Sequence, residues 1–211
     1  MAELNDTFTF LPLTVDARSK AVSAPAPPTT TPSSRALDAE LDALNQLHRS
    51  LLGLEAPLAV PPPPVPVNPR RSANVSKLRE SGNVEFRRGA YAEAVRFYAL
   101  GLRMALTRPL WEPSQLVREE VHQLFGNRAQ ALMALQRWAE GAVDAEASVE
   151  AKRQGNAKAW WRRGKCLTEM GRLEEAREWV GKGLEVEGED KELVELLREI
   201  VGRLEKRGMK Q

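Results

Sequence analysis

A repeated pattern of small and large residues in the last two thirds of the chain constrains the fold more than any other feature. Three windows align at Gly82, Ala129 and Gly164, where a small residue occupies the same slot. The following slots are large at Tyr91, Trp138 and Leu173, small at Ala94, Gly141 and Ala176, and small again at Gly101, Ser148 and Gly183. The second window begins 47 residues after the first, and the third begins 35 residues after the second. A period of this length indicates a solenoid of stacked helix pairs.

The spacing predicts an all-α domain of three helix pairs followed by a capping helix. Small residues let the two helices of a pair approach closely, while Gly89, Gln136 and Gly171 mark the turn inside each pair. The predicted pairs are 73–88 with 91–106, 115–135 with 139–152, and 156–169 with 173–187, in repeats at about 75–108, 122–155 and 157–190. A last helix over 190–207 has leucines and Ile200 on one face and closes the solenoid.

The longer first interval is explained by an insertion at residues 107–113. Pro109 and Pro113 break the helix there, and Trp111 lies between them. Because large aromatic residues in loops are usually packed or serve an interface, we expect this insertion to form a fixed, protruding turn.

The first part of the chain has a different character. Residues 7–15 alternate like a short strand, and no second strand candidate follows, so either a partner's strand completes it or the segment is a disordered arm. Residues 21–32 are rich in alanine, proline, serine and threonine, which predicts a flexible segment. An amphipathic helix is predicted over 35–54, with Ser34 as its N-cap and a stripe of leucines on one face.

The leucine stripe needs a surface to cover it, which is either this protein's own core or a second subunit. Residues 56–69 include four consecutive prolines from Pro61 to Pro64 and predict an extended polyproline spacer. A spacer separates independently acting parts and therefore favours the second subunit. The predicted organisation is a small strand-and-helix segment at 1–54 that binds a partner, a proline-rich linker at 55–72 and the repeat domain at 73–211.

Composition excludes several functional classes. The net charge of +2, with 28% charged residues, gives no global argument for nucleic-acid binding. Cys166 is the single cysteine and the two histidines lie far apart, so we expect no intrachain disulfide, no metal site and no cofactor. The sequence contains no run of about 18 apolar residues and no signal peptide at its amino terminus. We therefore expect a soluble, cytosolic protein.

Charged and amide residues on the predicted first helices suggest a binding groove. Lys158 and Arg162 stand four residues apart and project from one helix face. Arg79 and Asn83 repeat this spacing, and Asn127 lies on the helix between them. A single surface cation is usually only solvated, but first helices of stacked repeats line the concave face, where these five residues would gather. Together they predict a groove that holds a carboxylate.

The repeats and these five residues resemble the tetratricopeptide repeat (TPR) proteins that carry a dicarboxylate clamp. In those co-chaperones two lysines, two asparagines and an arginine bind the last residue of a chaperone tail ending in Glu-Glu-Val-Asp. The resemblance assigns the clamp to Arg79, Asn83, Asn127, Lys158 and Arg162, with arginine at 79 where the family usually has lysine. It also implies that side chains further along the peptide meet Phe86, Gln130 and Lys165.

The order of short motifs along the chain resembles one family of fungal proteins. Ala17-Arg-Ser-Lys20, the proline spacer, Arg108-Pro-Leu-Trp-Glu112 and Gly188-Glu-Asp-Lys191 occur in sequence. This order is similar to the cytosolic TPR subunit of the endoplasmic-reticulum post-translational translocation complex. The resemblance implies that residues 1–54 bind a membrane-anchored subunit and that the repeats recruit seventy-kilodalton chaperones. The protein would then sit on the cytosolic face of that membrane.

Two other functional classes are alternatives to a membrane-complex adaptor. A soluble TPR co-chaperone or assembly factor would use the same clamp without a membrane partner. An enzyme is disfavoured because no catalytic domain fits in the first 70 residues and the repeats contain no nucleophile–base pair. Cys166, between Gly164 and Leu167 on a first helix, is more plausible as a buried small residue than as a reactive thiol. The prediction is a non-enzymatic adaptor.

Overall fold

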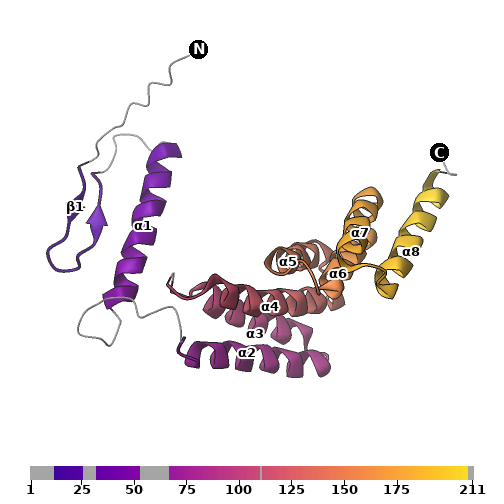
Figure 1. The fold of residues 1–211 in the computed structure, drawn as a ribbon, viewed down its shortest axis with the longest axis horizontal. Helices are drawn as coiled ribbons and strands as arrows, with labels where there is room; N and C mark the ends of the chain where they lie inside the picture. The colour runs from indigo at the N-terminus through magenta and orange to yellow at the C-terminus, as the bar shows by residue number, and fades with distance from the viewer. Residues whose placement is uncertain (1–11, 26–31, 53–66, 110, 209–211) are drawn as a thin grey trace, which may run out of the picture. The chain divides into compact units, whose positions relative to one another are not determined.

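Residues 12–25, 32–52, 67–109 and 111–208 are described by the computed structural model of the 211-residue chain (Figure 1). The chain divides into two units, with the main boundary between residues 63 and 64. The first contains a small hairpin and one helix, and the second contains a series of stacked helices. Each unit is considered by itself below.

The amino-terminal unit contains a β-hairpin that the sequence analysis did not predict. β1 (Thr14–Val15) pairs antiparallel with β2 (Val22–Ser23), so the expectation of a lone strand that needs an outside partner is wrong. Asp16 makes the turn, since its Oδ1 accepts the backbone N–H groups of Ser19 at 2.6 Å and Arg18 at 3.0 Å. These bonds, above all the one from the Ser19 N–H, lower the pKa of Asp16.

The segments around the hairpin also differ from the prediction. Part of the segment expected to be flexible, over 21–32, forms β2. α1 (Pro32–Leu52) begins before Ser34 instead of using it as an N-cap. Proline is tolerated in a first helical turn because its missing N–H would have no intrahelical partner there. Residues 7–11 of the predicted strand and most of the predicted linker lie outside the described residues.

One polar side chain of α1 binds the hairpin. Asn45 Nδ2 donates to the Val22 carbonyl and Asn45 Oδ1 accepts the Val22 N–H, both at 2.8 Å. The helix thereby satisfies both backbone groups of a strand residue. On the leucine stripe, Leu41 is half-buried whereas Leu44 remains 47% exposed. The stripe is not fully covered, and what covers the rest stays a prediction.

The second unit is a TPR-like superhelix, as predicted. Its helices are α2 (Arg70–Arg87), α3 (Tyr91–Leu106), α4 (Ser114–Ala134), α5 (Trp138–Ala151), α6 (Ala157–Glu169), α7 (Leu173–Glu187) and α8 (Lys191–Gly208). Each helix contacts the next, and α2, α4, α6 and α8 also contact one another in that order. These four helices form one layer of the superhelix, and α3, α5 and α7 each pack against the two helices of that layer that flank them in the chain. The helices begin and end within three residues of their predicted bounds.

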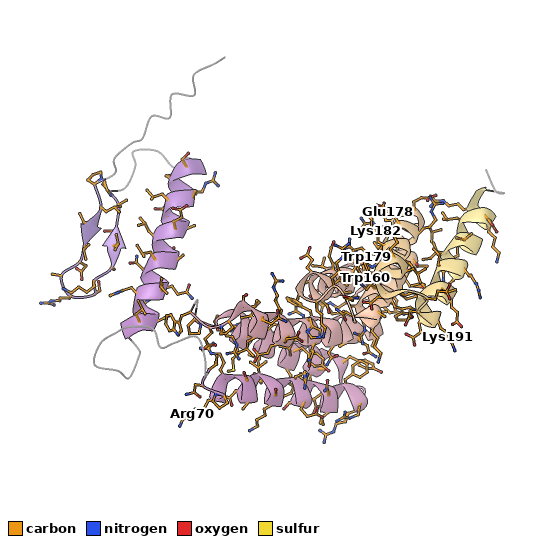
Figure 2. All side chains as sticks on the ribbon, in the orientation of Figure 1. Arg70, Trp160, Glu178, Trp179, Lys182 and Lys191 are labelled. Carbon is orange, nitrogen blue, oxygen red and sulfur yellow. The ribbon has the colours of Figure 1, made fainter. Side chains whose placement is uncertain are left out.

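The small-residue slots are where helices approach most closely. A Cβ added at Gly82 would lie 2.5 Å from the ring of Tyr98, and one at Gly164 would lie 2.5 Å from Val180. In the last repeat the rings of Trp160 and Trp179 are 4.4 Å apart (Figure 2). No side chain larger than hydrogen fits at these glycines without displacing a core residue, which confirms the physical basis of the repeat pattern.

The turns inside the three helix pairs share one backbone conformation. Gly89, Gln136 and Gly171 have φ angles of 78°, 57° and 75°. This left-handed region suits glycine and is uncommon for other residues. The middle repeat therefore keeps the turn geometry even though it lacks the glycine, which confirms the predicted equivalence of these positions.

A buried arginine anchors the insertion between the first two repeats. The Arg108 side chain is 1% exposed and donates to both carboxylate oxygens of Glu120, at 2.6 and 3.0 Å. It also pairs with Glu112 and donates to Ser72 Oγ at 2.8 Å. The insertion is thus bound to α2 and α4 through one side chain. Leu110 lies outside the described residues, and the role of Trp111 stays a prediction.

Candidate functional site

The predicted site residues lie on three neighbouring helices of one layer. α2 carries Arg79 and Asn83, α4 carries Asn127, and α6 carries Lys158 and Arg162. Contacts join α2 to α4 and α4 to α6. Because helix pairs repeat with a constant geometry, equivalent faces of these helices point to the same side of the superhelix.

Asn83 is the centre of a hydrogen-bond network that links two of these helices. Its Oδ1 accepts Asn127 Nδ2 at 3.0 Å and the Tyr98 hydroxyl at 2.9 Å. Its Nδ2 donates to Glu80 at 3.1 Å. A side-chain amide held at both ends has a fixed orientation, so the network determines which way Asn83 presents its donors.

Tyr98 is a member of this network that the sequence analysis did not assign to the site. It lies on α3 in a repeat slot that holds Ala145 and Val180 in the other windows. A polar aromatic residue in an otherwise aliphatic slot is a signal that could have identified it. Burial, together with the nearby Glu80 carboxylate, raises the pKa of Tyr98 to about 12, so its hydroxyl is a proton donor at neutral pH.

Arg162 is a half-buried cation that forms no ion pair within the described residues, and the Glu192 carboxylate on α8 acts on its charge. Its Nη2 donates to Gln130 Oε1 at 2.8 Å, and its Nη1 faces Gly126, where an added Cβ would lie 3.1 Å away. Burial lowers the pKa of Arg162, yet a guanidinium remains charged at neutral pH. A desolvated charge of this kind gains from an anionic ligand.

The other two predicted cations, half-buried Arg79 and exposed Lys158, also form no ion pair in the described part of the chain. The buried Nε of Arg79 has no hydrogen-bond partner there. Many cations elsewhere on the superhelix are paired, for example Lys182 with Glu178 at 2.6 Å. Three cations that form no ion pair among the described residues lie on the two helices either side of α4, and together with two oriented amides they form a site suited to carboxylates.

The residues predicted to meet more distant parts of a peptide have partners inside the protein. The rings of Phe86 and Tyr91 are 5.2 Å apart. Gln130 accepts the bond from Arg162, as described above. Lys165 Nζ lies 3.0 Å from Glu169 and 3.1 Å from Glu199. Their contact with a peptide stays a prediction.

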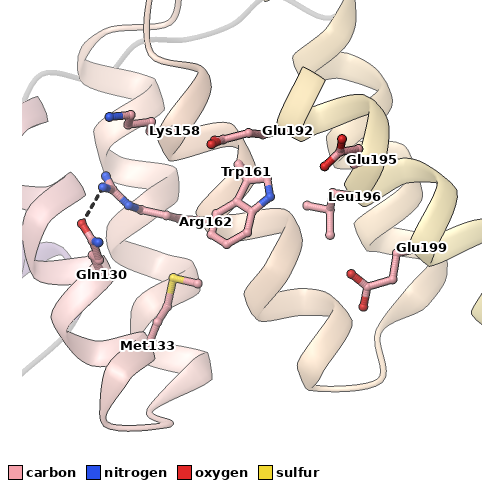
Figure 3. A pocket seen from close by; sticks show the side chains of 9 residues that line it. All are labelled: Gln130, Met133, Lys158, Trp161, Arg162, Glu192, Glu195, Leu196 and Glu199. Atoms are coloured by element: carbon pink, nitrogen blue, oxygen red, sulfur yellow. Dashed lines mark hydrogen bonds between the residues drawn. The ribbon is translucent and has the colours of Figure 1, made fainter. Parts of the chain in front are cut away.

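A cavity of about 580 Å³ opens beside Arg162, between α4, α6 and α8 (Figure 3). Side chains from all three helices line it: Gln130, Met133, Lys158, Trp161, Arg162, Glu192, Glu195, Leu196 and Glu199. The cavity extends the groove from the predicted clamp toward the carboxyl-terminal helix.

Other chemistry has little support in the described residues. No group of three or more His, Cys, Asp or Glu is placed to hold a metal ion there. Burial raises the pKa of Cys166 to about 12, which leaves the thiol protonated and a poor nucleophile at neutral pH. None of the described helices is long and apolar enough to cross a membrane.

The stacked helix pairs define the class of protein, a TPR domain, and solved structures agree. The first TPR of Spaghetti (RPAP3), bound to the HSP90 peptide SRMEEVD, has a TM-score of 0.53 and 29% identity, covering 63% of this chain and 94% of that one. The second TPR domain of human RPAP3, in complex with the HSP70 peptide SGPTIEEVD, has a TM-score of 0.52 and 25% identity, covering 62% and 97%.

More extensive similarity identifies the family, although no family model matches the sequence. The chain is 38% identical over 143 residues to the ER protein translocation subcomplex subunit sec67 of Schizosaccharomyces pombe, covering 67% of this chain and 74% of that protein. A chain in the cryo-EM structure of the Sec complex from S. cerevisiae has a TM-score of 0.75 and 25% identity, covering 93% of this chain and 99% of that one. The protein belongs to the Sec67 family.

Proposed function

We propose that this protein is a non-enzymatic adaptor of an endoplasmic-reticulum Sec complex that binds the acidic carboxyl-terminal tail of cytosolic seventy-kilodalton chaperones. The observation that carries the proposal is the group of three cations that form no ion pair within the described residues, Arg79, Lys158 and Arg162, beside the oriented amides of Asn83 and Asn127. By binding this tail the adaptor would dock the chaperone at the membrane, which supports post-translational protein translocation into the endoplasmic reticulum.

A chain that ends in aspartate fits this site chemically. Its last residue offers two carboxylates, one on the main chain and one on the side chain, which the amides and the cations can share. A hydrogen bond to a charged group contributes about 1.5–3 kcal/mol when it is shielded from water. The groove is open to solvent, so screening reduces this value, and micromolar affinity, about −8 kcal/mol, is expected.

Titration with a short peptide tests the proposal. A peptide ending in Glu-Glu-Val-Asp should bind with micromolar affinity, and amidating its terminus should weaken binding about ten- to a hundredfold because one carboxylate is lost. Affinity should also fall as salt is added, since the contacts are charged. Isothermal titration calorimetry measures the affinity for the acid, the affinity for the amide and the dependence of both on salt. Equal affinity for the acid and the amide would contradict a terminal-carboxylate clamp.

The amino-terminal segment has a separate role in this proposal. Residues 1–54 bind a membrane-anchored subunit, and the linker predicted at 55–72 ends earlier, where α2 begins at Arg70. The domain predicted at 73–211 carries the repeats at about 75–108, 122–155 and 157–190. The incompletely covered stripe of α1, where Leu44 is 47% exposed, supports an outside partner. Membership in the Sec67 family supports the cytosolic face of the endoplasmic reticulum as the place of action.

A truncated protein separates the two roles. Removing residues 1–66 leaves Asn68, whose Oδ1 accepts the Arg70 N–H at 3.0 Å and helps α2 to begin. This protein should unfold in one cooperative transition and bind the tail peptide with unchanged affinity, but it should not co-purify with Sec subunits from solubilised membranes. A truncated protein that shows no cooperative transition, or that precipitates, would contradict the separate roles. Loss of tail binding alone would place part of the clamp in the first unit.

The alternative is a soluble TPR co-chaperone or assembly factor with the same clamp. The similarity to the RPAP3 domains that bind chaperone peptides supports the clamp equally for a membrane adaptor and for a soluble co-chaperone. The two functions differ in the membrane partner. Full-length protein that stays in the cytosolic fraction, and does not co-purify with Sec subunits, would favour the alternative.

A further inference from the structure

The sign of the charge changes across the cavity beside Arg162. α6 contributes Lys158 and Arg162 to one wall, and α8 contributes Glu192, Glu195 and Glu199 to the opposite wall. Figure 3 shows the three carboxylates on α8 directed toward α6, with the indole of Trp161 between the two walls. An acidic peptide bound at the cations would meet like charges at its next residues if it continued into this cavity.

Two of the three carboxylates are available to a ligand. Glu199 is neutralised within the protein, since it pairs with Lys165 at 3.1 Å and Arg203 at 2.6 Å. Glu192 and Glu195 are exposed and form no hydrogen bond or ion pair within the described residues. The Glu192 carboxylate acts on the charge of Arg162 across the cavity, so Glu195 is the acidic side chain of this wall that faces no cation among the described residues.

The cavity combines carboxylates, an aromatic ring and apolar surface, which together can bind a basic side chain. Carboxylates accept charge-assisted hydrogen bonds from lysine or arginine, and an indole face attracts the same cation. Met133 and Leu196 add apolar surface on which the aliphatic stem of such a side chain can lie. The combination of free carboxylates, an aromatic ring and apolar side chains distinguishes this cavity from a solvated acidic surface.

We propose that this cavity binds a lysine or arginine side chain that lies on the amino-terminal side of the clamped acidic terminus. The inference rests on the proposed function, because the amides of Asn83 and Asn127, with the clamp cations, hold the last residue and set the register of the peptide. Among acidic-tailed peptides, the protein then prefers those with a basic residue at the right distance from the end, and it disfavours those with a carboxylate there.

The helix spacing defines that distance. Packed helices lie about 8–10 Å apart, so the step from Asn127 on α4, across α6, to α8 is about 16–20 Å. An extended peptide advances about 3.3–3.6 Å per residue, which gives about five or six residues. The peptide Ser-Arg-Met-Glu-Glu-Val-Asp, bound by the first TPR of Spaghetti, has its arginine five residues before the last one. It is therefore a suitable probe, whereas the HSP70 peptide Ser-Gly-Pro-Thr-Ile-Glu-Glu-Val-Asp has threonine at that position and would be held by the clamp alone.

The test measures how peptide charge and cavity charge depend on each other. The probes are Ser-Arg-Met-Glu-Glu-Val-Asp and the same peptide with its arginine replaced by alanine. They are titrated against the wild-type protein and the Glu192→Gln/Glu195→Gln variant. The control is Glu185→Gln/Glu205→Gln, which removes two exposed glutamates outside the cavity and has the same net charge.

The expected result is that the arginine improves wild-type binding about three- to tenfold. The advantage should fall below about twofold in the cavity variant and stay unchanged in the control, because only the cavity variant loses the facing carboxylates. Equal binding of the two peptides to the wild type, or an equal loss in both variants, would overturn the inference while leaving the clamp intact. Failure of both peptides to bind would overturn the proposed function and the inference with it.

Discussion

Replacing Arg162 with glutamate is expected to abolish measurable binding of a peptide that ends in Glu-Glu-Val-Asp. Arg162 is half-buried, donates only to the neutral Gln130 at 2.8 Å, and forms no ion pair within the described residues. The substitution would place a carboxylate where the peptide presents its own, and the two would repel. Arg162→Ala, which only removes the cation, should weaken binding by about 1.5–3 kcal/mol, or about ten- to a hundredfold.

The control for this experiment is Lys182→Glu. Lys182 pairs with Glu178 on α7 (Figure 2), and its substitution changes the net charge by the same amount without altering the groove. Calorimetry with the peptide acid and its amide, together with circular dichroism, separates lost binding from lost folding. If Arg162→Glu, Lys182→Glu and the wild type bind both peptides equally, the basic groove is only a solvated surface.

Replacing Arg108 with methionine should lower the free energy of unfolding by about 3–5 kcal/mol, more than any other substitution proposed for this protein. The side chain is almost completely buried, and its removal leaves the carboxylates of Glu112 and Glu120, which are 15% and 12% exposed, without their cation. Breaking a buried pair costs more than the pair contributes, because the remaining charge stays desolvated. The free energy of unfolding, measured by urea denaturation, gives the loss directly.

Two further variants show whether burial is the cause. Arg96→Met removes an arginine that pairs with Glu93 at 2.8 Å on the surface, where the side chain is 76% exposed, and should change stability by less than about 1 kcal/mol. Adding Glu120→Leu to Arg108→Met should recover part of the loss, because one unpaired buried charge is then removed. Equal losses in Arg96→Met and Arg108→Met would show that the Arg108 network does not stabilise the superhelix.

The inference about the cavity adds a second criterion to ligand choice in this groove. The clamp residues recognise a carboxyl terminus, which many acidic tails offer. Glu192 and Glu195 on α8 would then distinguish between those tails by the charge that comes before the acidic end. These two carboxylates would attract a basic residue of the peptide and repel an acidic one, so two side chains outside the clamp are enough to add specificity.

The sequence by itself determined the superhelix of the second unit. Helix periodicity and the repeated small slots are properties of nearby residues, so the seven helices fall within three residues of their predicted bounds. The closest approaches at Gly82 and Gly164 and the left-handed turn at Gln136 were all readable from the alignment of the windows. Residues four apart share a helix face in any α-helix, which is why Lys158 and Arg162 could be paired in advance.

The tertiary structure alone decided which distant side chains meet. Arg108 is buried against Ser72, 36 residues away, although an arginine beside a proline reads as an exposed loop residue. The hairpin at β1 depends on a turn made by Asp16, and the helix that covers β2 was not predicted to touch it. Sequence spacing specifies a face of a helix but not its neighbour across the groove. That is why Tyr98 joined the site, and Glu192 came to face Arg162, only when the repeats were stacked.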